Sequence, residues 1–186
     1  MDKSAENYLR FREKNDESAL VDIISVHKDG LIIYINTIVG DLNIAEELAI
    51  DTFALLAVKK PNDKHISSFK TWLYTIGRNL AIDYVRKKAR STSRVTSLED
   101  LSELEGDNDI VSEYIKKERD IMLHKALGFL KPEYRQILWL VYFENMSMKE
   151  AAAIMHKSVH AAEVTASRAR AALRKKLADE GFDYED

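Results

Sequence analysis

Apolar side chains recur at intervals of three and four residues between positions 20 and 38, which predicts a helix with one buried face. The stripe comprises Leu20, Ile23, Ile24, His27, Leu31, Ile35 and Ile38. Gly30 lies in the middle of the pattern and is expected to bend or break the helix. The sequence GDLN at 40–43 predicts a turn, with Asn43 as the N-cap of the next helix.

Two more helices are predicted in the N-terminal half of the chain. The first spans 43–60 and ends at Pro61. Its expected core stripe comprises Ile44, Leu48, Leu55 and Val58. After a polar loop, Ser67 or Ser68 is expected to cap a second helix over 69–90. The core stripe of that helix is expected to comprise Leu73, Ile76, Leu80 and Tyr84.

Residues 91–112 are rich in Ser, Asp and Glu and poor in large apolar residues, which favours a linker. Helical patterns resume at 113–130 and at 132–143, where Pro132 suits a first helical turn. Ser147 and Glu150 have the spacing of a capping box for a further helix. The chain is therefore predicted to be all-α. Two small helical domains, 1–90 and 113–178, are joined by the acidic linker and followed by an acidic tail at 179–186.

The alanine-rich stretch 147–176 predicts two helices separated by a break at 156–158, as in a helix-turn-helix. The second helix is expected to bury Val159, Ala162, Ala166, Ala169, Leu173 and Leu177. Its opposite face is expected to contact DNA and comprises His160, Glu163, Val164, Ser167, Arg168, Ala171 and Arg174. His156 stands where many such motifs have Gly, because the turn needs a positive φ.

Charge is unevenly distributed along this acidic chain. The whole sequence has 28 Lys and Arg against 31 Asp and Glu, but residues 119–178 carry 11 basic and 5 acidic side chains. The tail carries 5 acidic side chains and no basic ones. The C-terminal domain without its tail therefore suits a polyanionic partner. The alternative is that the five cations between 168 and 176 are solvated at the end of the helix, where they interact favourably with the helix dipole.

Signatures of enzymes and of metal sites do not occur in the sequence. It has no Cys, no Gly-rich phosphate loop and no G-x-S-x-G motif. The pairs Asp120–His124 and His156–His160 lack a third ligand at a suitable spacing, so no catalytic residue, metal or cofactor is predicted. The N-terminus lacks the apolar segment of a signal peptide, and no apolar run is long enough for a bilayer, which favours a cytoplasmic protein.

Two helices of the first domain have apolar, aromatic and charged side chains beyond those needed for a buried core. In 43–60, Glu46, Ile50, Phe53 and Ala57 share a second face, which suits a protein partner with cations around an apolar groove. The alternative is a two-sided core helix. In 69–90, aromatic side chains alternate with cations, as expected for stacking on unpaired bases beside phosphates. Here the alternative is that the aromatic rings are core.

The order of these elements resembles an extracytoplasmic-function (ECF) sigma factor of bacterial RNA polymerase over about residues 18–178. The resemblance rests on GDLNIAEELAIDTF, on FKTWLYTIGRNLAIDYVRKKAR and, after the acidic linker, on the segment that ends in the helix-turn-helix. It implies that the first domain binds the clamp helices of the largest polymerase subunit and opens the −10 element. The second domain would bind the −35 element and the flap of the second-largest subunit.

The resemblance and the helix faces together give the candidate site residues. Those for polymerase binding are Asp41, Glu46, Glu47, Ile50, Asp51 and Phe53. Those for the −10 element are Phe69, Trp72, Arg78, Asn79, Asp83, Arg86 and Lys87, with the loop 62–68 capturing a flipped base. Those for the −35 element are Ser158, His160, Glu163, Val164, Ser167, Arg168, Arg170 and Arg174.

Several positions depart from the pattern of the family. Ile50 stands where Gln is usual, His156 where Gly is usual and Glu163 where a cation is usual. A carboxylate at 163 can accept a hydrogen bond from a cytosine amino group, but it repels phosphates. Thr75 and Ile76 replace the tandem tryptophans of housekeeping sigma factors, which suggests weaker intrinsic melting and stricter promoter choice.

Three functions stay open at the level of the sequence. The favoured one is a non-enzymatic initiation factor, monomeric when free and without membrane contact, whose partners are core RNA polymerase, promoter DNA and, as a further candidate, an anti-sigma factor. The second is a helix-turn-helix regulator that binds DNA without polymerase. The third is a sigma-like protein that titrates a regulatory partner. The tail is expected to cover the basic helix end and to weaken DNA binding by the free protein.

Overall fold

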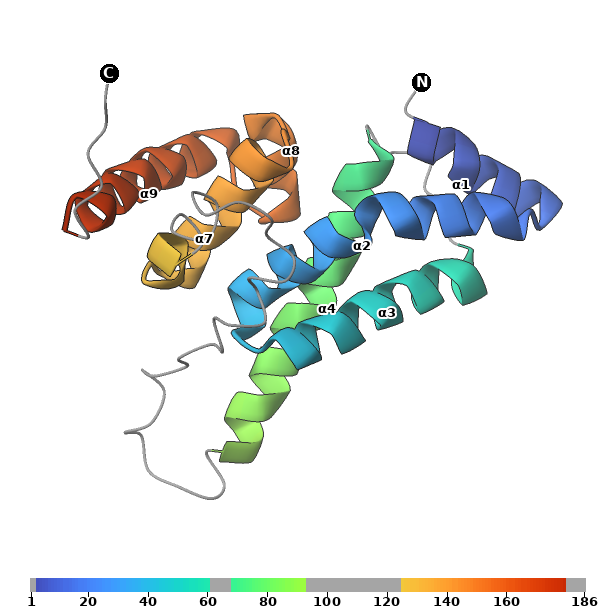
Figure 1. Cartoon of the computed structure of the whole chain (residues 1–186), viewed down its shortest axis with the longest axis horizontal. Helices are drawn as coiled ribbons and strands as arrows, with labels where there is room; N and C mark the ends of the chain where they lie inside the picture. Colours follow the sequence, from blue (N-terminus) through green and yellow to red (C-terminus); the bar gives the residue numbers. More distant parts are fainter. Residues whose placement is uncertain (1–2, 61–67, 93–124, 180–186) are drawn as a thin grey trace.

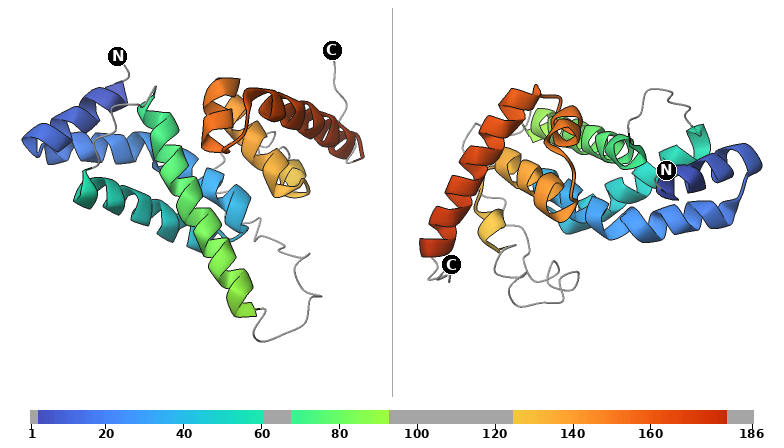
Figure 2. Two further views of the ribbon diagram at one scale, coloured as in Figure 1. Left: turned by 180° about the vertical axis from the view of Figure 1, so that it is seen from behind. Right: turned by 90° about the horizontal axis from the view of Figure 1, so that it is seen from above.

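The computed structural model describes residues 3–60, 68–92 and 125–179. Its elements are α1 (Lys3–Lys14), α2 (Glu17–Val39), α3 (Leu42–Lys59), α4 (Phe69–Thr92), α7 (Pro132–Leu138), the π-helix η1 (Trp139–Phe143), α8 (Met148–Ile154) and α9 (Val159–Asp179). Helices α1 to α4 form one bundle, and the elements from α7 onward form a second, smaller one beside it (Figures 1 and 2). No strand occurs in the described residues, so the all-α, two-domain prediction is confirmed.

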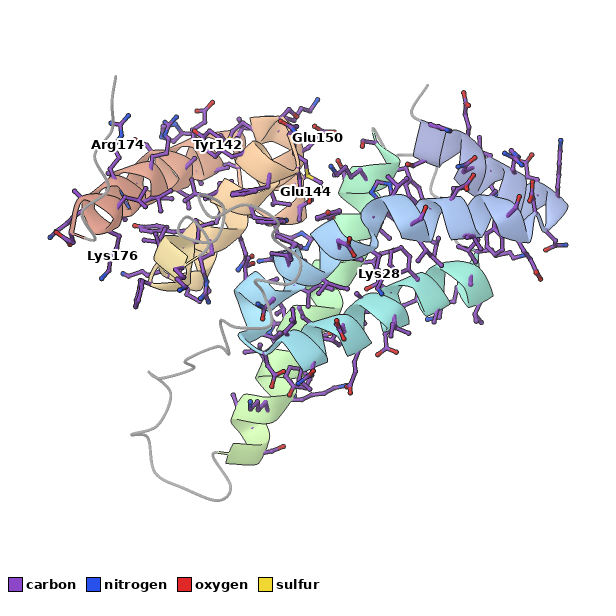
Figure 3. The ribbon with its side chains drawn as sticks, viewed as in Figure 1. Lys28, Tyr142, Glu144, Glu150, Arg174 and Lys176 are labelled. Carbon is purple, nitrogen blue, oxygen red and sulfur yellow. The ribbon has the colours of Figure 1, made fainter. Side chains whose placement is uncertain are left out.

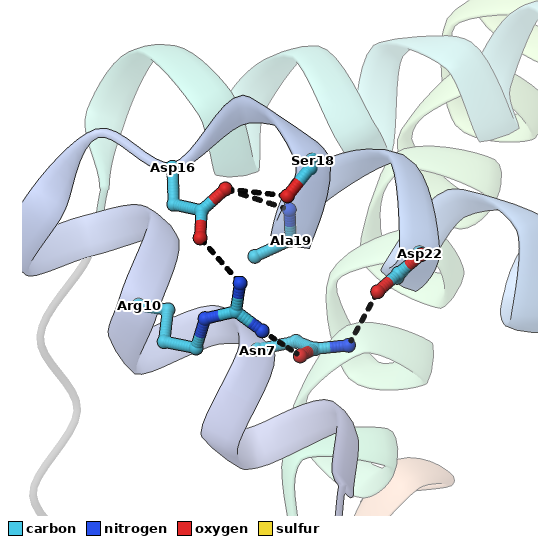
Figure 4. Close-up of polar contacts among 6 residues, drawn as sticks. All are labelled: Asn7, Arg10, Asp16, Ser18, Ala19 and Asp22. Atoms are coloured by element: carbon cyan, nitrogen blue, oxygen red, sulfur yellow. Dashed lines mark hydrogen bonds and ion pairs between the residues drawn. The ribbon is translucent and has the colours of Figure 1, made fainter.

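Helix α1 precedes the first helix that the apolar pattern predicts, and it is joined to α2 by a polar network (Figure 4). Asp16 is the N-cap of α2 and accepts hydrogen bonds from the Ala19 N–H and, at 2.6 Å, from the Ser18 hydroxyl. Arg10 donates to the same carboxylate at 2.5 Å. The hydrogen bonds from Ser18 and Arg10 lower the pKa of Asp16. The network fixes the direction in which α1 folds back along α2.

The inner face of α1 covers the beginning of α4. The ring of Tyr8 lies 5.3 Å from that of Phe69 and 5.2 Å from that of Trp72, measured between centroids. On the same side, the buried imidazole of His27 is hydrogen-bonded to the Ser4 hydroxyl at 2.8 Å. Two aromatic residues of the candidate −10 helix are therefore packed by the N-terminal helix.

Helix α2 continues through Gly30, so the helix is not broken at this residue. A Cβ added at Gly30 would lie 2.7 Å from the Tyr74 hydroxyl and would also meet the carboxylate of Glu144. The residue therefore provides room for a close approach inside a continuous helix. The helix ends instead at Gly40, whose φ of 70° gives the left-handed C-cap.

Helix α3 is present as predicted, but a different face of the helix is buried from the one that was predicted. Val58 is 83% exposed, and the other expected core residues, Ile44, Leu48 and Leu55, are only partly buried. The buried side chains are Leu42, Ala45, Ala49, Thr52, Phe53 and Leu56. Small residues at 45, 49 and 52 let α3 approach its neighbours closely, and hydrophobicity alone does not mark such a face. The N-cap is Asp41 and not Asn43, because Asp41 accepts from the Ile44 N–H at 3.2 Å.

Helix α4 begins after Ser68, whose hydroxyl accepts from the Thr71 N–H, in agreement with the predicted cap. In the second domain, Pro132 occupies the first turn of α7 as predicted. The expected helix over 132–143 changes at Trp139 into a π-helix, in which the Glu144 N–H donates to the Trp139 carbonyl at 3.1 Å. The rings of Trp139 and Phe143 stack with centroids 4.5 Å apart.

The helix-turn-helix is formed by α8 and α9. His156 has a φ of 53°, so the expectation of a left-handed residue in the turn is confirmed. In α9 the buried stripe includes Thr165, which the apolar pattern did not predict. Val159 was predicted to be buried, but it is 42% exposed, so this prediction is wrong. The buried Thr165 hydroxyl is satisfied because it donates to the Ala161 carbonyl at 2.7 Å.

The predicted capping box of α8 is present. The Ser147 hydroxyl accepts from the Glu150 N–H, and the Glu150 carboxylate accepts from the Ser147 N–H at 2.9 Å. The Ser147 hydroxyl also donates to this carboxylate, which, despite the opposing effect of burial, lowers the pKa of Glu150.

Glu150→Gln keeps an oxygen that can accept from the Ser147 N–H but removes the negative charge from the first turn of α8, so it is expected to lower the free energy of unfolding at pH 7 by about 0.3–1 kcal/mol. A lowered carboxyl pKa stabilises the fold above the ordinary pKa of Glu, and this stability is lost as the pH falls through the folded-state pKa. The difference between native protein and variant should therefore shrink at pH 3. Urea unfolding at both pH values measures it. Glu133→Gln, which removes an exposed ion pair with Lys157, should change stability by less than about 0.5 kcal/mol.

Candidate functional site

The candidate polymerase-binding residues lie on one exposed side of α3. Glu47, Ile50 and Asp51 are all exposed, Ile50 to 62%, and their spacing of three and four residues places them on the same helix face. These three residues are called the acidic–apolar strip below. Glu46 is half-buried beside it, and Asp41 caps the helix. A strip of this kind can bind a cationic surface with an apolar centre.

Phe53 does not belong to this surface. Its side chain is 6% exposed and is part of the core between the helices of the first domain. The reason is its position on the face of α3 that carries Ala49 and Leu56, both buried. Its predicted contact with polymerase is therefore not available in this conformation, and its role here is to support the helix that carries the strip.

The candidate −10 residues fall into three groups along α4. Phe69 is buried, and Trp72 is half-buried beneath α1, so the predicted stacking of Phe69 on a base does not fit this conformation. Asp83, Arg86 and Lys87 are exposed on the second half of the helix. Arg86 and Asp83 lie 3.7 Å apart as an exposed ion pair, which leaves the arginine accessible to a polyanion.

The third group, in the middle of α4, contacts the second domain. Arg78 Nε donates to Gln136 Oε1 at 3.4 Å. The His156 Nε2 atom lies 3.2 Å from Asn79 Oδ1. Two candidate −10 residues are therefore in contact with the domain that carries the helix-turn-helix.

The candidate −35 residues lie along α9, on which Arg174 is labelled in Figure 3. Exposed side chains on it are His160, Glu163, Ser167, Arg168, Arg170 and Arg174. Val164 is half-buried. The Ser158 hydroxyl accepts from the Ala161 N–H at 3.1 Å and so caps the helix. The structure thus brings together the predicted polar face with a cationic end, as a helix in a DNA groove requires.

Tyr142 is a residue beside this face that the sequence does not reveal. It belongs to the apolar run ILWLVYF, which is typical of a buried helix, yet it is 52% exposed. Arg170 donates to its hydroxyl at 3.2 Å. Tyr142 lies in the π-helix, and no pattern in the sequence predicts this helix.

Several predictions fall outside the described residues. They concern all but Ser68 of the loop 62–68, nearly all of the linker, the pair Asp120–His124 and all but the first residue of the tail. Among the residues that the structure describes, no three His, Cys, Asp or Glu side chains cluster to hold a metal ion. In the same part of the chain, no helix has the length and hydropathy needed to cross a membrane.

Comparison with known proteins gives two family matches that correspond to the two domains. Residues 23–91 match Sigma-70 region 2, and residues 120–173 match Sigma-70, region 4. The ECF RNA polymerase sigma factor SigW of Bacillus subtilis is 28% identical over 174 residues, covering 90% of this chain and 93% of SigW. The RNA polymerase sigma factor YlaC of the same organism is 30% identical over 139 residues, covering 73% of this chain and 79% of YlaC.

Two solved structures share the fold. The sigma factor RpoE of Bartonella quintana, in complex with the anti-sigma factor NepR, aligns with a TM-score of 0.67 at 23% identity, over 88% of this chain and 97% of RpoE. CnrH in complex with the cytosolic domain of CnrY aligns with a TM-score of 0.63 at 21% identity, over 95% of this chain and 96% of CnrH.

Proposed function

This chain belongs to the extracytoplasmic-function group of RNA polymerase sigma factors, and from that premise we propose how its surfaces bind polymerase and promoter DNA. The acidic–apolar strip of α3 binds the clamp helices of the largest polymerase subunit. The second half of α4 contacts the −10 element, and α9 contacts the −35 element. The second domain also binds the flap of the second-largest subunit.

The observation that carries this proposal is the separation of two exposed surfaces with opposite charge on two domains. The strip on α3 offers two carboxylates around Ile50, which suits a protein and repels DNA. The outer face of α9 offers Arg168, Arg170 and Arg174, which suit phosphates. A regulator that binds DNA alone has no use for the strip.

Further parts of the proposal concern the cell and other partners. The protein acts in the bacterial cytoplasm as a monomer and is not an enzyme. An anti-sigma factor is a proposed partner, since both solved structures of the same fold are complexes with a second protein, which for RpoE is an anti-sigma factor. Glu163, exposed on α9, accepts a hydrogen bond from a cytosine amino group at the −35 element.

Run-off transcription with purified bacterial core polymerase on a library of randomised promoters tests the proposal. The native chain is expected to give specific transcripts, and the selected templates then show the bases that α9 prefers. Arg168→Ala/Arg174→Ala should lower transcription by roughly 10-fold or more, because each lost contact costs about 1 kcal/mol or more.

Each other outcome points to one of the alternative functions. Binding to core polymerase without any transcript would favour a sigma-like protein that titrates a partner. Failure to bind core polymerase, together with specific and salt-dependent binding of duplex DNA by the isolated chain, would favour a regulator that works without polymerase.

A further inference from the structure

A tyrosine of the π-helix is hydrogen-bonded to an arginine of the helix that is proposed to bind DNA. The Tyr142 side chain is 52% exposed, and Arg170 Nη1 donates to its hydroxyl at 3.2 Å. The two residues are 28 positions apart in the sequence, on η1 and on α9. Tyr142 is labelled in Figure 3, together with Arg174, the exposed arginine one turn after Arg170.

The side chains around Tyr142 show that the core of the second domain does not need its ring. Trp139 and Leu140 are the buried residues of η1, and the ring of Phe143 stacks on that of Trp139 with centroids 4.5 Å apart. These side chains fill the inner side of the π-turn, and the Tyr142 ring is left at the surface. The phenol group is therefore available for a function at the surface.

Tyr142 holds Arg170 without neutralising it. In the part of the chain that the structure describes, Arg170 forms no ion pair with a carboxylate. A phenol hydroxyl accepts a hydrogen bond as a neutral group, so the guanidinium keeps its full positive charge. The guanidinium has further N–H donors beyond the one that contacts Tyr142, and these can bind a phosphate through parallel hydrogen bonds.

The neighbours of Arg170 on α9 explain why an acceptor is useful there. Ser167 and Arg174 lie three residues before it and four residues after it, on the same side of the helix, and both are exposed. Like charges four residues apart on a helix repel each other, so the two arginine side chains are pushed apart. The hydrogen bond to Tyr142 favours one conformation of Arg170 before DNA is bound. Such preorganisation reduces the entropy that is lost when a long side chain is immobilised on binding.

The position of Arg170 along α9 favours a phosphate over a base. In a helix-turn-helix, residues in the N-terminal part of the recognition helix contact base edges. Arg170 lies in the second half of α9 (Val159–Asp179). It also borders the packed face of the helix, because Ala166 and Ala169, four residues and one residue before it, are buried.

We infer that Tyr142 is a positioning residue for promoter binding, whose hydroxyl holds Arg170 toward a phosphate of the DNA backbone beside the −35 element. Tyr142 acts through Arg170 and makes no base contact of its own. The inference rests on the proposed function of α9.

Open-complex formation by core polymerase with the full chain tests the inference, on a promoter selected in the transcription experiment. Its rate is measured against the concentration of the complex between polymerase and this chain, which gives promoter affinity and maximal rate separately. Tyr142→Phe keeps the ring and removes the hydroxyl, so it is expected to weaken promoter affinity about 3- to 10-fold, the size of one hydrogen bond. The maximal rate should stay native, because strand opening is assigned to α4.

The matched control is Tyr134→Phe. It removes a hydroxyl from a half-buried tyrosine of the same domain, for which the described structure records no hydrogen bond. This variant should keep native promoter affinity. Thermal unfolding of each variant should give a native midpoint, which shows that a loss of affinity is not a loss of folded protein.

A second set of measurements separates a positioning role from other roles. Arg170→Ala should make the plot of log affinity against log salt concentration less steep by about 1, the change expected for one lost phosphate contact. Adding Tyr142→Phe to Arg170→Ala should cause no further loss, because the tyrosine acts through the arginine. The loss in Tyr142→Phe should be equal on promoters with different −35 sequences, since a phosphate contact carries no sequence information.

Three results would overturn the inference while the proposed function stands. Native affinity in Tyr142→Phe would mean that the hydroxyl does not contribute. A loss that persists in the Arg170→Ala background would mean that Tyr142 acts on its own. A loss confined to one −35 base pair would mean that the pair contacts a base. If the native chain forms no open complex on any promoter, the proposed function itself has failed, and the inference falls with it.

Discussion

Glu47→Lys/Asp51→Lys will abolish transcription with core polymerase while the chain stays folded. Both carboxylates are exposed on one face of α3 beside Ile50, and neither makes a hydrogen bond or ion pair that the described structure records. Reversing two charges that meet cations in the proposed complex replaces attraction by repulsion. A loss of about 2–5 kcal/mol, or roughly 30- to 5,000-fold in affinity for core polymerase, is expected for such a change.

The measurement is binding of the labelled chain to core polymerase, followed by run-off transcription at a concentration near the Kd of the native chain. Glu6→Lys/Glu17→Lys is the matched control, because it changes the net charge equally at exposed positions of α1 and α2. The control is expected to keep native affinity at physiological salt. Equal losses in both double variants would mean that net charge, and not the strip, decides the affinity.

Phe53→Ala will lower the free energy of unfolding by about 3–5 kcal/mol, the usual effect of truncating a buried Phe to Ala. The aromatic ring is buried in the core of the first domain and not on the surface where the sequence pattern placed it. Urea unfolding measures the change. Polymerase affinity per folded molecule should stay close to native.

Ile50→Ala, on the same helix, is expected to have the opposite effects to Phe53→Ala on stability and on polymerase binding. The Ile50 side chain is exposed, so its truncation should change stability by less than about 0.5 kcal/mol but should weaken polymerase binding. If Phe53→Ala were as stable as the native chain and lost polymerase affinity, Phe53 would have to leave the core on binding.

The sequence pattern predicts which segments are helical far better than it predicts which side they bury. The helices α2, α3, α4 and α9 are predictable from apolar spacing and from caps such as Ser68 and Ser147, because these signals are local. On α3 the pattern indicates the wrong core face, since Val58 is exposed and Ile44, Leu48 and Leu55 are only partly buried. Close packing there uses alanines, whose small side chains give almost no hydrophobic signal.

The parts of the site that depend on tertiary contacts could not be predicted. Helix α1 has only two buried aromatic residues, Tyr8 and Phe11, in an otherwise polar segment, so its pattern is weak. Lys70 and Glu144 form an ion pair but lie 74 positions apart in the sequence, and nothing local to either residue indicates the other. The outer face of α9 was predictable, because its polar residues repeat with the period of the helix.

The π-turn at Trp139–Phe143 adds one residue to the helix that precedes the helix-turn-helix, and this residue affects how the helix-turn-helix is oriented. A turn closed by a bond between residues five apart holds one residue more than an α-helical turn. In a regular helix of 3.6 residues per turn, each added residue rotates the rest of the chain by about 100° around the helix axis. The single additional residue therefore changes the rotation of the chain about the axis of α7. This rotation sets the direction in which α8 and α9 leave α7.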